Sequence, residues 1–429
     1  MVLEMKDQSD ILKIYEKAAH WPPYSYHDYP DVTRESLNSF ISFLDTENSD
    51  GSKIELQPWI PFCDSKCAFC YFPTELFSYE KSARYLLALK KLFRMYAQTR
   101  YIKSSEFPEI YFGGGDPAVL SSEELIDLLS FCEREFNVSK DRIVKVTGST
   151  HNFEDKKMEL LAKNGVNQLD LGIQTFDNDI RKAFNLRDNS LEAERKIKSA
   201  HKLGLAVSID LMYNLPKQTL DIWRNDIQKA LQLDVESVDC YPLHVYPDTF
   251  LAGQLKLGKM SPIGSSEFEM QMYLEAYNVL TKSGYMPAGH NRFSRVAEDH
   301  AEPCFEILGT GAGFFMGFLG RYSYTDIKPS DAYTDRVENG KFPISRLLVS
   351  SEEDEMRRMI TMRLFVRLPV NKDYFKKRFR KLPEDVFKKS INSLKKKGLI
   401  EVDDQEIKLT TLGDMWRYNI VWEFSQAET

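Results

Sequence analysis

The 429-residue chain has little that would mark a secreted, membrane or nucleic-acid-binding protein. Its formal net charge of −7 gives no overall case for binding nucleic acid or a membrane surface. The longest apolar stretch, from Ile307 to Leu319, contains four glycines and is shorter than the roughly 18–20 residues of a membrane-spanning helix. The first ten residues lack the apolar core of a signal peptide. We therefore expect a cytoplasmic protein without a membrane partner.

Cysteine is also scarce, with six in the whole chain. A chain of this length with 42% hydrophobic residues can form a core without disulfide bonds, so the even count does not indicate them. Three of the cysteines stand alone, as small buried hydrophobic residues often do. The other three, Cys63, Cys67 and Cys70, fall within eight residues, and this clustering indicates a metal site.

Short β-rich runs alternate with amphipathic helices about six times from Ile54 onward. This alternation predicts a parallel sheet with right-handed crossovers, and both an open doubly wound sheet and an incomplete (β/α) barrel fit it. In either fold, functional groups belong at the carboxyl ends of the strands. The expected strands are 54–59, 109–112, 143–147, 168–173, 206–212 and 237–241, and the helices between them include 79–96, 156–163, 191–203 and 220–233.

The chain divides into four predicted regions. An N-terminal arm of residues 1–50 precedes a core of residues 51–260 that carries the motifs. Residues 261–345 have a looser pattern with a glycine-rich stretch, and we expect them to close over the site. Residues 346–429 are predicted to form helices and a short hairpin around Asp403-Asp404, an arrangement that resembles a winged-helix module.

The cysteine loop supplies three thiolates in the spacing Cys63-x-x-x-Cys67-x-x-Cys70. A structural zinc site uses four protein ligands, and no fourth cysteine or histidine lies near, since the closest upstream histidine is His27. Three ligands suit a [4Fe–4S] cubane in which one iron stays open to bind a small molecule. The pattern therefore favours an iron–sulfur cluster over zinc.

Several segments resemble the radical SAM superfamily, and more narrowly its oxygen-independent coproporphyrinogen oxidase branch. The likeness implies a partial (β/α)6 TIM-type barrel that holds a [4Fe–4S] cluster, cleaves S-adenosylmethionine (SAM) reductively and generates a 5′-deoxyadenosyl radical. It is strongest over residues 54–260. The segments that carry it are Ile60-Pro61-Phe62-Cys63 with the cysteine loop, residues 111–117 around Gly113-Gly114-Gly115, residues 171–176, residues 210–219 and, more weakly, residues 398–413.

The resemblance also implies a set of cofactor contacts. In that family a second SAM lies beside the first, and the matching positions assign binding roles to this chain. Glycines after a strand let the backbone approach a ligand closely, although a triple glycine alone is a generic turn. Without the motifs, Arg187 would be interpreted as a solvated helix end and Asp210 as a strand-end cap. The implied cofactor-binding residues are Phe69, Gly114, Gly115, Asp116, Gln174, Arg187 and Asp210.

Two departures from the branch bear on the reaction. Gln57 and Trp59 stand where the porphyrinogen enzymes have tyrosine and histidine, and Thr147 lies where they carry a glutamate. Both changes argue against coproporphyrinogen decarboxylation. We therefore expect a class C methyltransferase or cyclopropanating enzyme that transfers a methyl or methylene group to an sp² carbon of a small unsaturated or aromatic molecule. The alternatives are coproporphyrinogen dehydrogenation or anaerobic heme opening, and a non-catalytic heme or Fe–S trafficking protein.

Residues just ahead of the glycine-rich stretch are candidates for the substrate side. Tyr285 and His290 are the predicted catalytic residues, for substrate contact or proton transfer, although a lone histidine is more often structural. Residues 372–397 contain eleven Lys or Arg and three acids. We expect first a solvated face there, second a docking surface for an acidic electron donor such as flavodoxin or ferredoxin, and only third a nucleic-acid contact.

Overall fold

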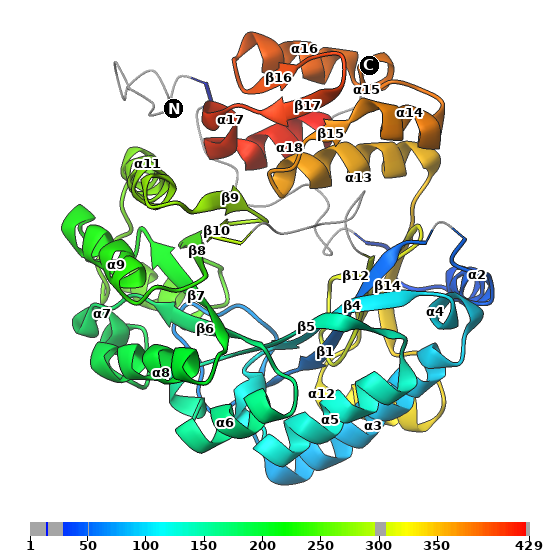
Figure 1. Cartoon of the computed structure of the whole chain (residues 1–429), viewed down its shortest axis with the longest axis horizontal. Coiled ribbons are helices and arrows are strands. Elements are labelled where there is room, and N and C mark those ends of the chain that lie inside the picture. The colour runs from blue at the N-terminus through cyan, green and yellow to red at the C-terminus, as the bar shows by residue number, and fades with distance from the viewer. Residues whose placement is uncertain (1–13, 16–28, 50, 297–305, 426–429) are drawn as a thin grey trace.

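The computed structural model describes residues 14–15, 29–49, 51–296 and 306–425. Its centre is a curved sheet in which six parallel strands follow one another, with helices packed on the outer side (Figure 1). This arrangement confirms the predicted partial barrel. The strands are β1 (Lys53–Ile60), β4 (Glu106–Gly114), β5 (Val138–Gly148), β6 (Gln168–Gln174), β7 (Ala206–Tyr213) and β8 (Ser237–Pro242).

The outer helices begin and end near the predicted positions. For example, Ser121 and Glu124 form the capping box that starts α5, because each side chain accepts a hydrogen bond from the other residue's backbone amide. The apolar faces of these helices pack on strand residues such as Leu56 and Ile110, which are fully buried. The helices are α3 (Tyr79–Ala97), α4 (Arg100–Lys103), α5 (Ser122–Glu135), α6 (Asp155–Lys163), α7 (Asn178–Ala183), α8 (Ser190–Lys202), α9 (Leu220–Gln232), α10 (Phe250–Lys256) and α11 (Ser266–Lys282).

The sheet extends beyond the six predicted strands at both edges. Strand β11 (Glu306–Thr310) lies parallel to β1, so the glycine-rich stretch expected to be a turn is partly a strand. At the other edge, β10 (Arg292–Ser294) pairs antiparallel with β8 and with β9 (Met286–Ala288). Beyond β11 follow β12 (Gly317–Leu319), β13 (Tyr322–Asp326) and β14 (Ile344–Val349), with α12 (Ser330–Glu338) between the last two and α2 (Arg34–Leu44) beside them.

The C-terminal part packs against the β9–β10 edge of the barrel (Figure 1). Its three-stranded sheet, in the order β15-β17-β16, contains the predicted hairpin and agrees with a winged-helix-like module. Strand β14 runs through residue 346, so the structure places the start of this part closer to 350 than to the predicted boundary. Its elements are α13 (Glu352–Phe365), β15 (Val370–Asn371), α14 (Lys372–Phe379), α15 (Pro383–Val386), α16 (Lys388–Lys396), β16 (Ile400–Val402), β17 (Glu406–Leu409), α17 (Thr411–Met415) and α18 (Arg417–Ser425).

Within the described ranges, every helix is too short or too polar to cross a membrane.

Candidate cofactor and substrate site

The cysteine loop leaves the carboxyl end of β1 and is held by backbone hydrogen bonds. The short parallel pair β2 (Phe62–Cys63) and β3 (Glu75–Leu76) closes its base, and the Phe77 amide donates to the Cys63 carbonyl at 2.9 Å. Cys63, Cys67 and Cys70 are free thiols, each partly buried. The predicted ligands therefore lie together on one short, well-fixed loop at the barrel mouth.

Without a metal, the buried thiols of the cysteine loop stay protonated. Burial, and then the neighbouring Asp116 and the other thiols, raise the pKa of Cys63 well above that of an ordinary cysteine, and burial with Cys70 raises the pKa of Cys67 to about 12. A cation beside them would reverse this by stabilising the thiolates. Across the described residues, no three Cys, His, Asp or Glu side chains converge tightly enough to share one metal ion. Thiolates that each bind a different iron of a cubane lie farther apart, so this donor set fits the cluster.

Glycines at the end of β4 allow that strand to touch the cysteine loop. Gly114 has a φ of +129°, and a Cβ there would lie 2.3 Å from the Ile60 carbonyl oxygen. A Cβ on Gly115 would lie 2.7 Å from the Cys63 sulfur. Since real Cβ atoms essentially never approach so closely, these positions require glycine for packing, whatever they also contribute to SAM.

Asp116 is buried, and both oxygens of its carboxylate accept hydrogen bonds from neighbouring residues. Its carboxylate accepts hydrogen bonds from the Ala118 and Ser149 amides, each at 3.1 Å, and from Asn152 Nδ2 at 3.0 Å. These contacts tie the end of β4 to the turn after β5. The structure thus gives Asp116 a positioning role beside Cys63, and its predicted contact with SAM stays a prediction.

The other predicted SAM residues lie at the carboxyl ends of β6 and β7 or next to the cysteine loop. Gln174 ends β6 with a φ of +66°, a strained conformation for a residue with a side chain. Asp210 points into the barrel, and among the described residues its carboxylate makes no hydrogen bond or ion pair. Phe69 packs on Phe184 with ring centroids 5.9 Å apart. The half-exposed Arg187 donates to Asp64 Oδ2 at 2.7 Å.

Asp64 and His151 were not singled out from the sequence. Asp64 lies inside the cysteine loop, and its Oδ2 lies 2.8 Å from His151 Nε2 as well as 2.7 Å from Arg187. Burial opposes ionisation of Asp64, but the hydrogen bond from His151 and the charges of His151 and Arg187 outweigh it and lower its pKa. A histidine directly after the strand 143–147 was the available signal, because residues at that edge face the cysteine loop.

The barrel interior is lined by charged side chains rather than by a uniformly apolar core. Burial, and then the charges of Asp239 and Asp170, raise the pKa of Asp210 well above its ordinary value, while Arg292 opposes this rise. Burial and Glu109 likewise raise the pKa of Glu55 to about 8. The lining groups are the acids Glu55, Glu109, Asp170, Asp210 and Asp239 and the bases Lys145 and Arg292.

Aromatic side chains surround the end of β1 next to the cysteine loop. Trp59 meets Phe314 and Phe315 edge-on, with ring centroids 5.5 Å away in both cases. Tyr71, directly after Cys70, stacks on Tyr246 at 4.0 Å. Gly311 lies against Trp59, since a Cβ there would be 2.5 Å from the Trp59 carbonyl oxygen. The predicted closing segment therefore does contact the site.

His290 and Tyr285, the predicted catalytic residues, lie at opposite ends of the sheet. His290 is at the tip between β9 and β10, near the carboxyl end of β8, with its Nε2 2.5 Å from the Tyr418 hydroxyl. The fully buried Tyr285 donates to the carbonyl of Val235, which precedes β8 and so lies at the amino end, far along the strand from the cysteine loop. The structure therefore gives Tyr285 a structural hydrogen bond and brings only His290 to the barrel mouth.

The basic segment 372–397 has the predicted apolar side. Phe375, Phe379 and Phe387 are buried, as expected for core residues. Lys372 is buried too, and it pairs with Glu384 and the Asp403 carbonyl. Most of the remaining lysines and arginines are exposed on α14 and α16.

Comparisons with known proteins agree with this fold. The family model "Radical SAM superfamily" matches residues 58–230, and "HemN C-terminal domain" matches residues 350–416. The chain superposes on coproporphyrinogen III oxidase HemN from Escherichia coli with a TM-score of 0.83 and 20% identity, covering 97% of this chain and 98% of that one.

Three curated relatives span most of the chain. The heme chaperone HemW of Bacillus subtilis is 26% identical over 364 residues, which are 83% of this chain and 95% of the relative. The anaerobilin synthase of Escherichia coli O157:H7 is 24% identical over 333 residues, 75% and 74% of the two chains. The oxygen-independent coproporphyrinogen III oxidase of Helicobacter pylori is 24% identical over 441 residues, 96% of each chain.

Proposed function

We propose that this chain is a radical SAM protein of the HemN-like branch, with a [4Fe–4S] cluster and SAM as its cofactors, and that it acts on a tetrapyrrole. When bound, the cluster and SAM supply one-electron chemistry that ends in abstraction of a hydrogen atom from a substrate. The three cysteines would hold the cluster. Asp210 and Gln174 would accept and donate hydrogen bonds to SAM, and a second SAM beside the first belongs to the same proposal.

The relatives support a tetrapyrrole more than the methyl or methylene transfer that the sequence suggested. They are a heme chaperone, an anaerobilin synthase and a coproporphyrinogen oxidase, and their matches cover between 75% and 96% of this chain. None of these names a methyltransferase or a cyclopropanating enzyme. A small unsaturated or aromatic substrate that is not a tetrapyrrole is therefore the less supported alternative.

The observation that carries the proposal is the aromatic cluster at the barrel mouth. Trp59, Phe72 and Phe315 form mutual ring contacts between 5.5 and 5.9 Å, and Tyr71 stacks on Tyr246 beside them. Planar conjugated molecules gain dispersion and stacking energy on such side chains. A flat macrocycle would match the partly exposed rings Tyr71, Phe72 and Phe315, which the buried Trp59 supports from behind, next to the cysteine loop where the hydrogen atom would be taken.

Two substitutions support a reaction other than decarboxylation. Gln57 is buried, donates to Glu55 at 2.6 Å and leaves its Oε1 without a hydrogen-bond partner among the described residues. Thr147 donates its hydroxyl to the Asp170 carbonyl at 3.1 Å. Neither side chain offers the phenol or carboxylate that the porphyrinogen oxidases have at these positions. We therefore favour heme opening or another radical reaction on a tetrapyrrole.

The test is anaerobic turnover of the reconstituted protein. Protein, SAM and dithionite are incubated with hemin, with coproporphyrinogen III or with neither, and the nucleoside products are measured by mass spectrometry. We expect hemin to increase 5′-deoxyadenosine and to lose its absorption spectrum, with no activity in Cys67→Ala. Formation of S-adenosylhomocysteine beside deoxyadenosine would contradict the proposal and support methyl or methylene transfer. Tight hemin binding with neither product would support a carrier role.

The exposed basic faces of α14 and α16 support a further element of the proposal, an acidic electron donor of the flavodoxin or ferredoxin type. Its docking would weaken as ionic strength rises, because exposed charges are screened by salt.

A further inference from the structure

The β9–β10 hairpin connects the C-terminal part to the interior of the barrel. Strand β10 pairs antiparallel with β8, which places Arg292 opposite Asp239. The tip of the hairpin, residues 289–291, lies near the carboxyl end of β8, on the side of the barrel that holds the cysteine loop. Any shift of this tip therefore moves Arg292 relative to the carboxylates of the barrel.

Arg292 neutralises part of a row of three aspartates on neighbouring strands. Its Nε donates to Asp239 Oδ2 at 2.9 Å, and its Nη2 lies 3.7 Å from Asp170 Oδ2. The third aspartate, Asp210, is in register with Asp239 on β8. Because one arginine serves three carboxylates, its position decides which of them stays available to another partner.

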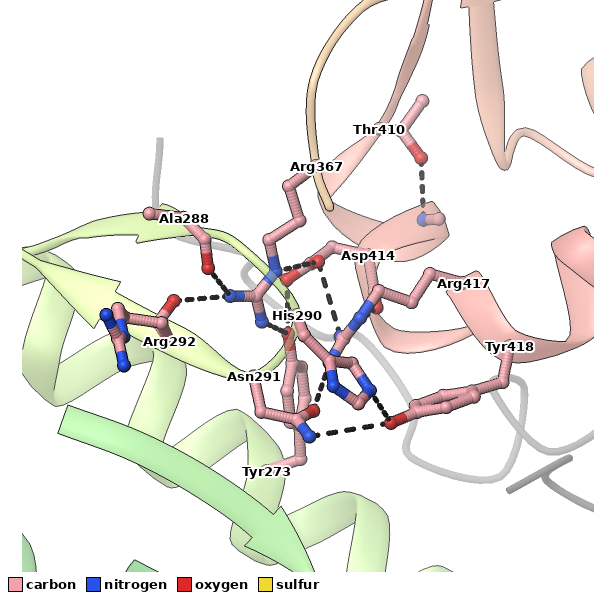
Figure 2. A network of polar contacts seen from close by, with 11 residues as sticks. Tyr273, Ala288, His290, Asn291, Arg292, Arg367, Thr410, Asp414, Arg417 and Tyr418 are labelled. Atoms are coloured by element: carbon pink, nitrogen blue, oxygen red, sulfur yellow. Dashed lines mark hydrogen bonds and ion pairs between the residues drawn. The ribbon is translucent and has the colours of Figure 1, made fainter. Parts of the chain in front are cut away.

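Arg367 of the C-terminal part holds the hairpin by its backbone. Its Nη1 donates to the carbonyls of Ala288 at 3.2 Å and Arg292 at 2.5 Å, one on each side of the tip (Figure 2). Its Nε donates to Asp414 at 2.7 Å, and its Nη2 donates to the Tyr273 hydroxyl at 3.1 Å. The Arg367 side chain is only 4% exposed, so these bonds are shielded from water and salt.

A second arginine, Arg417, holds the tip of the hairpin through the side chain of Asn291. Arg417 donates to Asn291 Oδ1 at 2.5 Å and to the Asp414 carbonyl at 3.0 Å. Beside it, the Tyr418 hydroxyl lies 2.5 Å from His290 Nε2 (Figure 2). Groups of the C-terminal part thus hold two residues of the tip, His290 and Asn291, and the carbonyl of the next residue, Arg292.

We propose that the C-terminal part sets the affinity for SAM by fixing the hairpin so that Arg292 stays on Asp239 and Asp170, which leaves Asp210 free to accept hydrogen bonds from the cofactor. Arg292 is a positioning residue, and Arg367 and Asn291 act through it. The inference rests on the proposed function only in that Asp210 contacts SAM.

The electrostatic surroundings of Asp210 explain why the arginine matters. Asp210 faces Asp170 on β6, Asp239 on β8, Arg292 on β10 and the phenols of Tyr111 and Tyr241. Without Arg292, the two other carboxylates would act on Asp210 unopposed. Asp210 would then hold a proton more tightly and would lose acceptor capacity for the cofactor hydroxyl or amine groups.

The experiment measures SAM binding without turnover. Protein is reconstituted anaerobically, iron and sulfide are quantified, and the dissociation constant for labelled SAM is measured by equilibrium dialysis as a function of pH. The variants are Arg292→Gln, Arg292→Lys, Arg367→Gln and Arg292→Gln/Arg367→Gln. Asn291→Ser weakens the contact at the tip without removing a buried charge. It takes the place of Arg367→Gln in the experiment if that variant does not fold. Arg224→Gln, on the exposed face of α9, is the matched control.

We expect Arg292→Gln to raise the dissociation constant about tenfold, the loss of roughly one charge-assisted hydrogen bond, with unchanged iron content. Its binding should recover as pH rises, and Arg292→Lys should restore part of the affinity. Arg367→Gln or Asn291→Ser should weaken binding in the same direction, and the double variant should bind no more weakly than Arg292→Gln alone.

Unchanged SAM affinity in Arg292→Gln, or fully additive losses in the double variant, would overturn the inference while leaving the proposed function intact. A wild-type protein that carries its cluster but does not bind SAM would overturn both. Arg224→Gln should behave as wild type.

Discussion

Alanine at Gly115 should disturb the cysteine loop more than the overall fold. Gly115 does not have a positive φ, so its backbone conformation accepts alanine, and the effect is steric alone. The added Cβ would lie 2.7 Å from the Cys63 sulfur, 2.8 Å from the Phe62 carbonyl oxygen and 2.9 Å from Thr74 Cγ2. Two of these atoms belong to the segment that carries Cys63, the first of the proposed cluster ligands, so that segment must move.

The magnitude follows from the cost of overpacking. Inserting a methyl group into a filled site typically costs about 1–3 kcal/mol. We therefore expect Gly115→Ala to lower the melting temperature of the protein without cluster and to reduce iron and sulfide content after reconstitution. Gly253→Ala is the matched control, because Gly253 lies in α10 without a positive φ and with no atom within 4 Å of its added Cβ. That substitution should stabilise the helix by about 1 kcal/mol at most.

Both proteins are assayed by thermal unfolding followed by circular dichroism and by iron, sulfide and absorbance measurements. If Gly115→Ala loaded as much iron as wild type and melted at the same temperature, the close packing of β4 on the cysteine loop would be wrong. If Gly253→Ala lost iron as well, the effect would not be specific to the loop.

Further predictions concern single groups. Cys67→Ala should abolish iron loading, and a variant that still carries a full cluster would refute the ligand assignment. Asp210→Asn should weaken SAM binding while cluster absorbance stays intact; loss of the cluster instead would show a structural role. Tyr285→Phe should cost roughly 1 kcal/mol of stability and leave deoxyadenosine formation unchanged, because among the described residues its hydroxyl bonds only to the Val235 carbonyl; a large drop in turnover would instead support a catalytic role for Tyr285. Burial raises the pKa of Glu306 to about 7 from an ordinary 4.5, so the folded state holds this proton more tightly than the unfolded state does. Stability should therefore fall as pH rises from about 4.5 to about 7, by up to about 3 kcal/mol, and Glu306→Gln should flatten this part of a denaturation profile; an equally steep profile in the variant would contradict it.

The parallel core was predictable because its strands are buried on the helix side and carry regular apolar residues. Ile54 and Leu56 or Val144 and Val146 alternate with lumen residues in a way that periodicity detects. The starts of helices were predictable from capping residues, such as Ser121 with Glu124 three positions later. The short strands β9 to β14 were missed because runs of three to six residues carry almost no periodic signal, and β9, β11 and β12 also contain proline or glycine.

The site was predictable only where a contiguous motif defines it. Cys63, Cys67 and Cys70 lie in one loop, so their spacing already fixes their common location. Asp170, Asp239 and Arg292 come from three different strands, and only the sheet register brings them beside Asp210. The pairing of Asp64 with His151 joins residues 87 positions apart, so no contiguous motif contains both residues.

The anchoring of the hairpin has a consequence for how this architecture can be divided or recombined. The C-terminal part contacts the carbonyls and the asparagine of this particular hairpin through a matching set of side chains, Arg367 and Arg417, which both donate to Asp414. A buried arginine that loses its partners strongly destabilises the folded protein. Chimeras between this chain and its relatives should therefore tolerate exchange of the C-terminal part only when residues 286–294 travel with it. The C-terminal part and the β9–β10 hairpin therefore form one packing unit.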